Sequence, residues 1–345
     1  MLRIARGSAA ALTAAMLLAA CTVGPNYRRP DLPTAAGYGA AATPSASAPK
    51  LVASEDVPAA WWRVYHSAEL DDLVALALKT NSTIDAARAA LRAAQEQVRA
   101  QRSAGYPQVT GGLQPGRQKV ADTLASPLSN NEELYSLTTT QLSVGYSPDL
   151  FGANRRAVES LQAQADAQRF ELEAARLTLA ANVVAAAIQD ALLRAQLDDS
   201  RAVVDEQRES VASFERQLKL GQASSADLAA QQAQLAQAQA ALPPLEKQFQ
   251  VNRDLLAALV GRTPGEPVDL RFDLSSLTLP DQLPLSLPAQ LVEHRPDVRL
   301  AEAQLHAASA QIGVAKAARL PDVAHWSISF STSFRRSIRR GQKAR

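Results

Sequence analysis

The chain has few aromatic residues and a single cysteine, Cys21, among its 345 residues. Phe, Trp and Tyr make up 5% of it, which excludes a bulky aromatic core, while abundant alanine favours long helices packed through small side chains. One cysteine excludes a disulfide framework and a cysteine-based metal site. The composition therefore predicts a mainly helical protein without covalent cross-links.

The formal net charge of +2 conceals an uneven distribution. Six positive charges fall in the last eleven residues, which leaves −4 for the remainder of the chain. The basic pI is therefore no argument for nucleic acid, and no nucleic-acid partner is expected.

Motifs of covalent chemistry are absent. There is no phosphate loop and no dinucleotide fingerprint, and His66, His294, His306 and His325 lack metal-ligand spacing. Glu293-His294 is interpreted as a solvated loop pair. We expect no catalytic residue, no metal and no cofactor, and an enzyme is the least favoured class.

The first 21 residues have the pattern of an export signal. Two arginines precede an apolar stretch from Ala9 to Ala20, which is too short for a transmembrane helix and ends in Leu18-Ala19-Ala20-Cys21. Small residues before a cysteine resemble a lipobox, which would make Cys21 an acylated first residue and residues 1–20 a lipoprotein signal peptide. An ordinary signal peptide with an incidental cysteine is the alternative. Thr22, rather than Asp, favours sorting to the outer membrane by the same resemblance.

Two short regions with strand patterning follow a proline-, alanine- and serine-rich linker (residues 21–60) and a helix expected from about Leu70 to Ala104. The first is Val109 to Gln114. In the second, Leu134 to Ser147, Leu142, Val144 and Tyr146 alternate with polar or small residues. Such alternation suits a strand with lipid on one side and water on the other, although a soluble hairpin has the same pattern.

A long helical hairpin is the strongest feature of the sequence. No proline occurs between Pro148 and Pro243, and a seven-residue apolar period indicates a left-handed coiled coil of about 100 Å. The period is carried by Val158, Ala165, Leu172, Leu179, Ala186 and Leu193, then by Val183, Asp190, Leu197, Val204, Val211 and Leu218. Gly221 to Ser225 breaks it, and a return helix is expected from about Ala226 to Val260. Asp190 on the apolar stripe is interpreted either as a buried register-setting residue or as part of a water-filled interior.

An internal repeat appears at a shift of 214 residues, which aligns Asn81–Pro107 with Arg295–Pro321. Identical residues at eight positions include Leu91/Leu305, Gln97/Gln311 and Pro107/Pro321. We therefore predict a two-repeat, mainly α fold with a small β part and long antiparallel coiled-coil hairpins.

Together these features resemble the TolC-like outer-membrane efflux factors, in particular their NodT-like lipoprotein branch. The resemblance is carried by Cys21-Thr22-Val23-Gly24-Pro25-Asn26-Tyr27 with Arg29-Pro30, Trp61-Trp62 before Leu70-Asp71-Asp72-Leu73, Tyr146 to Gly152, Leu220 to Asp227, and Arg295-Pro296-Asp297-Val298.

The resemblance implies a homotrimer whose strands form a shared transmembrane β-barrel and whose helices form a periplasmic tunnel. It implies export of drugs or other small molecules with a periplasmic adaptor and an inner-membrane RND-type pump, and a lipid-anchored place in the bacterial outer membrane. The adaptor-contacting tip would map to Leu220, Gly221, Ser224, Ser225 and Asp227, although any tight helical turn also requires Gly221 and Ser224.

The expected domains are a first repeat at 61–262, a proline-rich crossover at 263–293 and the start of a second repeat at 294–322. From residue 323 to 345 the sequence departs from the family's pattern, and this aberrant basic tail is interpreted as the result of truncation or a frameshift, with a natural short form as the alternative. A truncated chain would be non-conducting. The competing function is a structural, non-conducting periplasmic coiled-coil lipoprotein.

Overall fold

The computed structural model describes residues 23–31, 50–53, 58, 60–119, 134–263, 265–266, 273–274, 277–278, 282–285, 294–321 and 326–337. The chain divides into two compact units, one made of Met1–Arg28, Ala93–Ala165 and Ala303–Arg345, the other of Arg29–Arg92 and Asp166–Glu302. The predicted signal peptide, Cys21, most of the linker, the loop Ala121–Glu133 and His325 lie outside the described residues.

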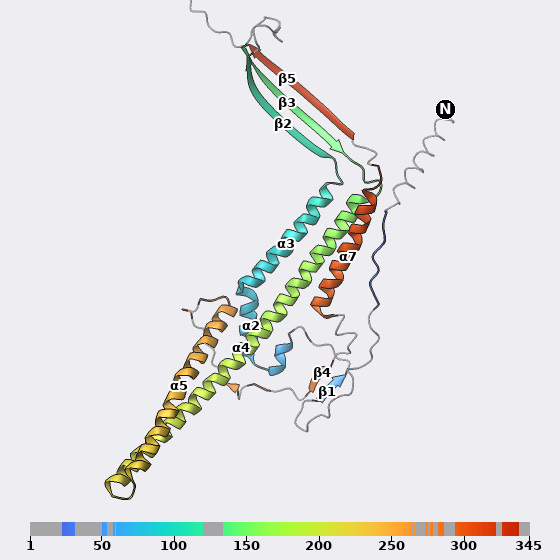
Figure 1. The fold of residues 1–345 in the computed structure, drawn as a ribbon. Coiled ribbons are helices and arrows are strands. Elements are labelled where there is room, and N and C mark those ends of the chain that lie inside the picture. The colour runs from blue at the N-terminus through green and yellow to red at the C-terminus, as the bar shows by residue number, and fades with distance from the viewer. Residues whose placement is uncertain are drawn as a thin grey trace, which may run out of the picture. The chain divides into compact units, whose positions relative to one another are not determined.

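The second unit is built around the part of the long helix α4 (Ala153–Lys219) that follows Ala165 and around the return helix α5 (Ser225–Leu259), which run antiparallel (Figure 1). Polar contacts join them at three levels. The Asn252 amide donates to the Ala186 carbonyl at 2.9 Å, Arg201 pairs with Glu246 at 3.2 Å, and Ser210 donates to Gln231 at 3.2 Å. The predicted hairpin is confirmed, including Pro243 and Pro244 inside α5.

The core of this unit is aliphatic, as the composition predicted. Leucine, valine, isoleucine and alanine fill it, because helices packed through small side chains approach closely. Its buried members are Leu70, Leu73, Val74, Ala77, Ile84, Leu172, Leu179, Ala180, Val183, Val184, Ala186, Ala187, Ala191, Leu256, Ala257 and Val260. The 3-10 turn η1 (Trp61–Tyr65) packs its aromatic rings against the edge of this cluster.

The helix expected from about Leu70 to Ala104 is two helices, α2 (Ala68–Thr80) and α3 (Ser82–Ser103). Asn81 is extended between them (φ −70°, ψ 126°), and its side-chain oxygen accepts from Thr83 N at 2.8 Å. Its amide donates to the Leu259 carbonyl at 2.9 Å. The expectation of one helix was wrong here because apolar spacing continues across the break, whereas the capping bond and the contact with α5 favour an extended Asn81.

The first unit contains an antiparallel sheet of β2 (Gln108–Lys119), β3 (Leu134–Tyr146) and β5 (Trp326–Ser337), in the order β2-β3-β5 (Figure 1). β2 extends beyond the Val109–Gln114 strand expected from sequence, and Pro115 fits because β2 is at the edge of the described sheet. β5 occupies part of the segment that the sequence analysis assigned to a basic tail, and Arg335 and Arg336 lie inside it.

Helix α7 (Pro296–Ala317) is the counterpart of α3 in the second repeat. The first and last residues of α3 and α7 both differ by 214, which agrees with the shift found in the sequence. β2 follows α3 and β5 follows α7, and the two strands pair with opposite edges of β3. The two-repeat fold, mainly α with a small β part, is confirmed.

Two further features are minor. A parallel pair joins β1 (Lys50–Ala53) and β4 (Gln282–Leu285) in the second unit. α4 contains a stretch long and apolar enough to cross a membrane by length and composition, but half of that stretch is buried inside the fold, as in the core helix of a soluble protein.

Candidate functional site

The β2-β3-β5 sheet has one strongly apolar face. Directly paired residues in an antiparallel sheet share a face, so the register places Val109, Val144 and Ile328 together, as it does Leu142 with Phe330. We call this the apolar face; its large side chains are Val109, Leu113, Leu142, Val144, Tyr146, Ile328, Phe330 and Phe334. All but the half-buried Val144 are between 40% and 70% exposed.

The opposite face of the sheet is mostly polar. It carries glutamine, serine and threonine, together with Tyr135, whose hydroxyl donates to Gln118 at 2.7 Å. Its polar members include Gln108, Thr110, Gln114, Thr139, Gln141, Ser143, Ser329, Ser331 and Ser333. A sheet with one exposed apolar face and one polar face fits a boundary between lipid and water. The three residues singled out from the sequence, Leu142, Val144 and Tyr146, share the apolar face, while their contact with lipid stays a prediction.

The hairpin tip is a tightly closed turn. Gly221 has φ +74°, its N–H donates to the Leu218 carbonyl at 2.9 Å, and Gln222 N donates to the Gln217 carbonyl at 2.8 Å. These two bonds and a left-handed glycine form a Schellman end of α4. An alanine at Gly221 would meet no atom within 4 Å, so the glycine serves the backbone angle rather than packing.

A capping box starts α5 on the other side of the tip. The Ser224 hydroxyl accepts from Asp227 N at 3.2 Å, and the Asp227 carboxylate accepts from Ser224 N at 3.0 Å. Hydrogen bonds from the Ser224 hydroxyl and backbone lower the pKa of Asp227. The predicted tip residues Leu220, Gly221, Ser224, Ser225 and Asp227 are all exposed at this turn. The local fold explains Gly221, Ser224 and Asp227 without a partner, but it gives no reason for a leucine at position 220, which is 72% exposed.

An N-terminal strap, residues 23–28, is fixed along the helices of the first unit. Val23 N donates to the Phe151 carbonyl at 3.2 Å, just after β3 ends. Gly24 has φ +116°, and an added Cβ would lie 2.5 Å from the Gly313 Cα. Tyr27 stacks on the His306 ring of α7, with centroids 4.4 Å apart.

A buried arginine connects the strap to α4. Arg156, 5% exposed, donates to the Asn26 side chain and pairs with Glu159, each at 2.7 Å. The other Glu159 oxygen lies 3.0 Å from His306 Nε2. Burial alone would raise the pKa of Glu159, but hydrogen bonds with Arg156 and His306 and their positive charge hold that pKa below its ordinary value.

This network was not predicted from the sequence, where the strap carries only a family resemblance and His306 lacks metal-ligand spacing. Arg156 and Glu159 had no signal of their own, because charged residues on a long helix are usually solvated.

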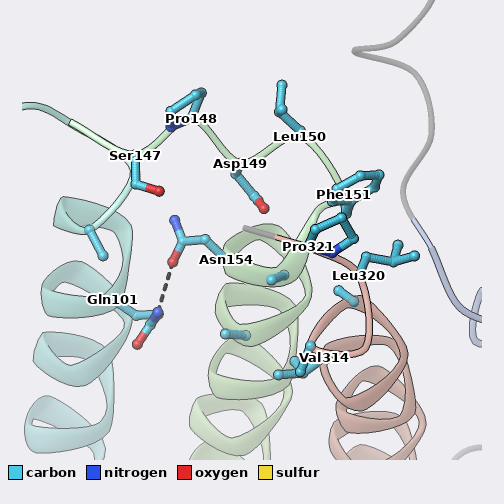
Figure 2. A pocket seen from close by; sticks show the side chains of 15 residues that line it. Gln101, Ser147, Pro148, Asp149, Leu150, Phe151, Asn154, Val314, Leu320 and Pro321 are labelled. Carbon is cyan, nitrogen blue, oxygen red and sulfur yellow. Dashed lines mark hydrogen bonds between the residues drawn. The ribbon is translucent and has the colours of Figure 1, made fainter. Parts of the chain in front are cut away.

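A pocket of about 490 Å³ lies in the first unit where α3, α4 and α7 meet the strand connections (Figure 2). Figure 2 shows the Gln101 and Asn154 amides in contact at 2.7 Å beneath Ser147, Pro148 and Asp149. Phe151, Leu320 and Pro321 form its apolar side. Asp149 accepts from Arg155 N at 2.8 Å, which stabilises the turn into α4.

His66, His294 and His306 are the histidines that the structure describes. Among the described residues there is no group of three or more His, Asp or Glu that could hold a metal. Asp190 is 1% exposed and pairs with Arg194 at 2.7 Å, while its Oδ1 has no partner among the described atoms. This geometry fits the buried alternative for Asp190 rather than the water-filled one.

Comparison with known proteins matches the part of the chain from α2 to the end of α5 to one family model. The model described as "Outer membrane efflux protein" matches residues 73–262, more than half of the chain. The fusaric acid resistance protein FusA of Burkholderia cepacia is 33% identical over 277 residues, which cover 77% of this chain and 51% of FusA. Nodulation protein T of Rhizobium leguminosarum biovar viciae is 28% identical over 319 residues, covering 91% of this chain and 62% of that protein.

A solved structure shows the same arrangement of elements. The outer-membrane channel OprN matches with a TM-score of 0.72 and 28% identity, over 90% of this chain and 68% of that one. The chain thus spans between half and two thirds of the length of the curated relatives it matches here.

Proposed function

Because the chain belongs to the outer membrane efflux protein family, we propose that it is a subunit of an outer-membrane duct through which small molecules are exported. In this function the chain performs no covalent chemistry and serves as a passage. The relatives are named for resistance to fusaric acid and for nodulation, so the proposed cargo is a class, drugs or other small organic molecules, rather than one compound.

The observation that carries the proposal is the two-faced sheet. An exposed face bearing leucine, isoleucine and phenylalanine would be costly in water, at about 25 cal/mol for each Å² of apolar surface. In lipid that cost disappears, and the serine- and glutamine-rich face then borders water. The three strands that the structure describes leave edges that a bilayer does not tolerate, so the proposed state is a closed barrel. The family resemblance implies that three copies of the chain share it.

Paired cysteine substitutions on neighbouring positions test the sheet. Leu142→Cys lies on the apolar face and Ser143→Cys on the polar face, one residue apart. In the membrane-embedded chain, a fluorophore attached to the Leu142→Cys variant should be quenched by a lipid-dissolved quencher, and the Ser143→Cys variant should react with a water-soluble thiol reagent. Equal reaction of both variants with the aqueous reagent would favour the competing function, a periplasmic coiled-coil lipoprotein that conducts nothing.

We further propose that Cys21 is acylated and anchors the chain in the outer membrane. The supporting observation is the bond between Val23 N and the Phe151 carbonyl, because two extended residues reach only about 7 Å. An acylated Cys21 would therefore start close to the end of β3. Cys21→Ser should remove the acyl mass from the intact protein, and a mass difference equal to the substitution alone would contradict the anchor.

The proposed partners are a periplasmic adaptor and an inner-membrane pump of the RND type. The hairpin tip supports this assignment through Leu220, an exposed apolar side chain without a role in the turn. Photo-crosslinkers at Leu220 and at Gln222 in living cells would test it. Crosslinks to a periplasmic protein from these positions, and none from the exposed Gln239 in the middle of α5, are expected.

A further inference from the structure

The charged residues of the sheet are all cationic and all lie towards one end. β2, β3 and β5 contain no Asp or Glu, and their charges are Arg117, Lys119, Arg335 and Arg336. The register places Arg117, Lys119 and Arg336 on the apolar face, because Arg117 and Arg336 both pair with Ser136 and Lys119 pairs with Leu134. Arg335 pairs with Leu137 and lies on the opposite face. We call Arg117, Lys119 and Arg336 the cationic rim.

The other end of the sheet is aromatic and uncharged. Tyr146 pairs there with Trp326, and Val109 is the neighbouring apolar position on β2. The sheet therefore differs in charge between its two ends. The end with Val109, Tyr146 and Trp326 has no charged residue, and cations occur only beyond Leu113 and Phe334.

The spacing of the rim matches the thickness of a bilayer. Ser136 is ten residues from Tyr146, about 34 Å along an extended strand. At the tilt of about 40° usual for membrane strands, this is about 26 Å along the membrane normal, close to the apolar band of about 25 Å. The cations would thus stand at the level where hydrocarbon gives way to headgroups.

We propose that the cationic rim binds the phosphate groups of lipid headgroups, an inference that rests on the proposed insertion of the sheet. Arginine suits this ligand, since its guanidinium donates paired hydrogen bonds to phosphate oxygens.

Vesicle binding by the full chain tests the proposal. All variants carry Cys21→Ser, so that attachment to the membrane depends on the sheet and not on acylation. Co-flotation of each variant is measured with phosphatidylcholine vesicles that contain or lack phosphatidylglycerol. Each basic side chain near an anionic surface contributes about a factor of five. R117Q/K119Q should therefore lower the preference for the anionic vesicles about 30-fold, and R336Q should lower it about 5-fold.

The matched control is R201Q/R208Q, which removes the same charge from exposed positions of α4 and should leave the preference unchanged. An unchanged preference in R117Q/K119Q would overturn the proposal. So would equal binding to vesicles made anionic with oleate, which lack the additional phosphate. If the parent chain does not bind neutral vesicles, the proposed insertion of the sheet is wrong. If it binds neutral and anionic vesicles equally, the insertion stands and only the proposed phosphate binding by the cationic rim is wrong.

Discussion

Asn81 shows how one buried polar side chain can determine local structure. Its oxygen caps α3 at Thr83, and its amide reaches the Leu259 carbonyl, so both ends of the side chain are used. Asn81→Ala should lower the free energy of unfolding by about 2 kcal/mol, because a cap is lost and a buried carbonyl loses its donor.

Asn81→Ser separates these two contributions. Its hydroxyl can still cap α3 but is too short to reach Leu259, so we expect a smaller loss than in Asn81→Ala. Denaturant unfolding in detergent measures both variants. Equal losses would mean that the cap contributes nothing.

Glu159 gives the strap a dependence on pH. Its folded pKa is below the ordinary value, so its stabilisation is complete above about pH 4.5 and is lost as pH falls through the folded pKa. The melting temperature of the chain should therefore exceed that of Glu159→Gln near neutral pH, and the difference should shrink in acid.

Glu96→Gln is the control for this comparison, since Glu96 pairs with Arg99 on an exposed surface where ion pairs contribute little. Its melting temperature should stay close to that of the parent. A Glu159→Gln difference that persists unchanged in acid would contradict the assigned role of the carboxylate.

At the scale of elements, the long helices were predictable and their interruption was not. Absence of proline and a seven-residue period predicted α4 as one long helix, because a pattern repeated many times is insensitive to one exception. The break at Asn81 depends on a carbonyl of α5 that is 178 residues away, which no local pattern contains.

The strands were predicted less completely than the helices. Alternation identified β3, but β2 was expected to end near Gln114 because its later residues are polar, glycine or proline. Cross-strand pairing with β3 extends it to Lys119. β5 was obscured by its arginines, since a basic segment was interpreted as a tail, whereas pairing with β3 extends the strand through Arg336.

The turn between α4 and α5 offers a test at this scale. Gly221→Ala has room for its Cβ but must adopt φ near +74°, at a cost of about 1 kcal/mol. The Gln222 amide, bonded to Gln217, should then exchange its hydrogen about five times faster. Asparagine tolerates this angle better than alanine, so the exchange rate in Gly221→Asn should lie between those of the parent and of Gly221→Ala. An unaltered rate in Gly221→Ala would mean that the turn adapts without strain.

At the scale of the whole molecule, the strap connects the proposed membrane anchor to the folded chain. The anchor would be Cys21, and the first described bond after it joins Val23 to Phe151, in the connection between β3 and α4. The family-like residues that follow the lipobox acquire a physical role here: Gly24 permits contact with Gly313, Asn26 accepts from Arg156, and Tyr27 covers His306. Acylation alone would attach the chain through a flexible segment, whereas the fixed strap would hold the acylated residue close to the strands.

Gly24→Ala should release the strap while the rest of the chain stays folded. The new Cβ would lie 2.5 Å from the Gly313 Cα, and the alanine would have to keep a φ of +116°. Because the atom that it meets belongs to the backbone, no side-chain movement can relieve the contact. Strain of about 1–3 kcal/mol should raise the population of the detached strap roughly 5- to 150-fold. Limited trypsin digestion after Arg28 measures this population, and the N-terminal fragment should appear correspondingly faster.

Gly265→Ala is the matched control, because its Cβ would meet no atom within 4 Å. It should leave the cleavage rate at Arg28 unchanged. Gly313→Ala approaches the same contact from α7, where the added Cβ would lie 2.8 Å from the Arg156 side chain, so it should also speed cleavage, but less, since that side chain can move. Cleavage of Gly24→Ala at the parental rate would show that the strap is not held by its contact with Gly313.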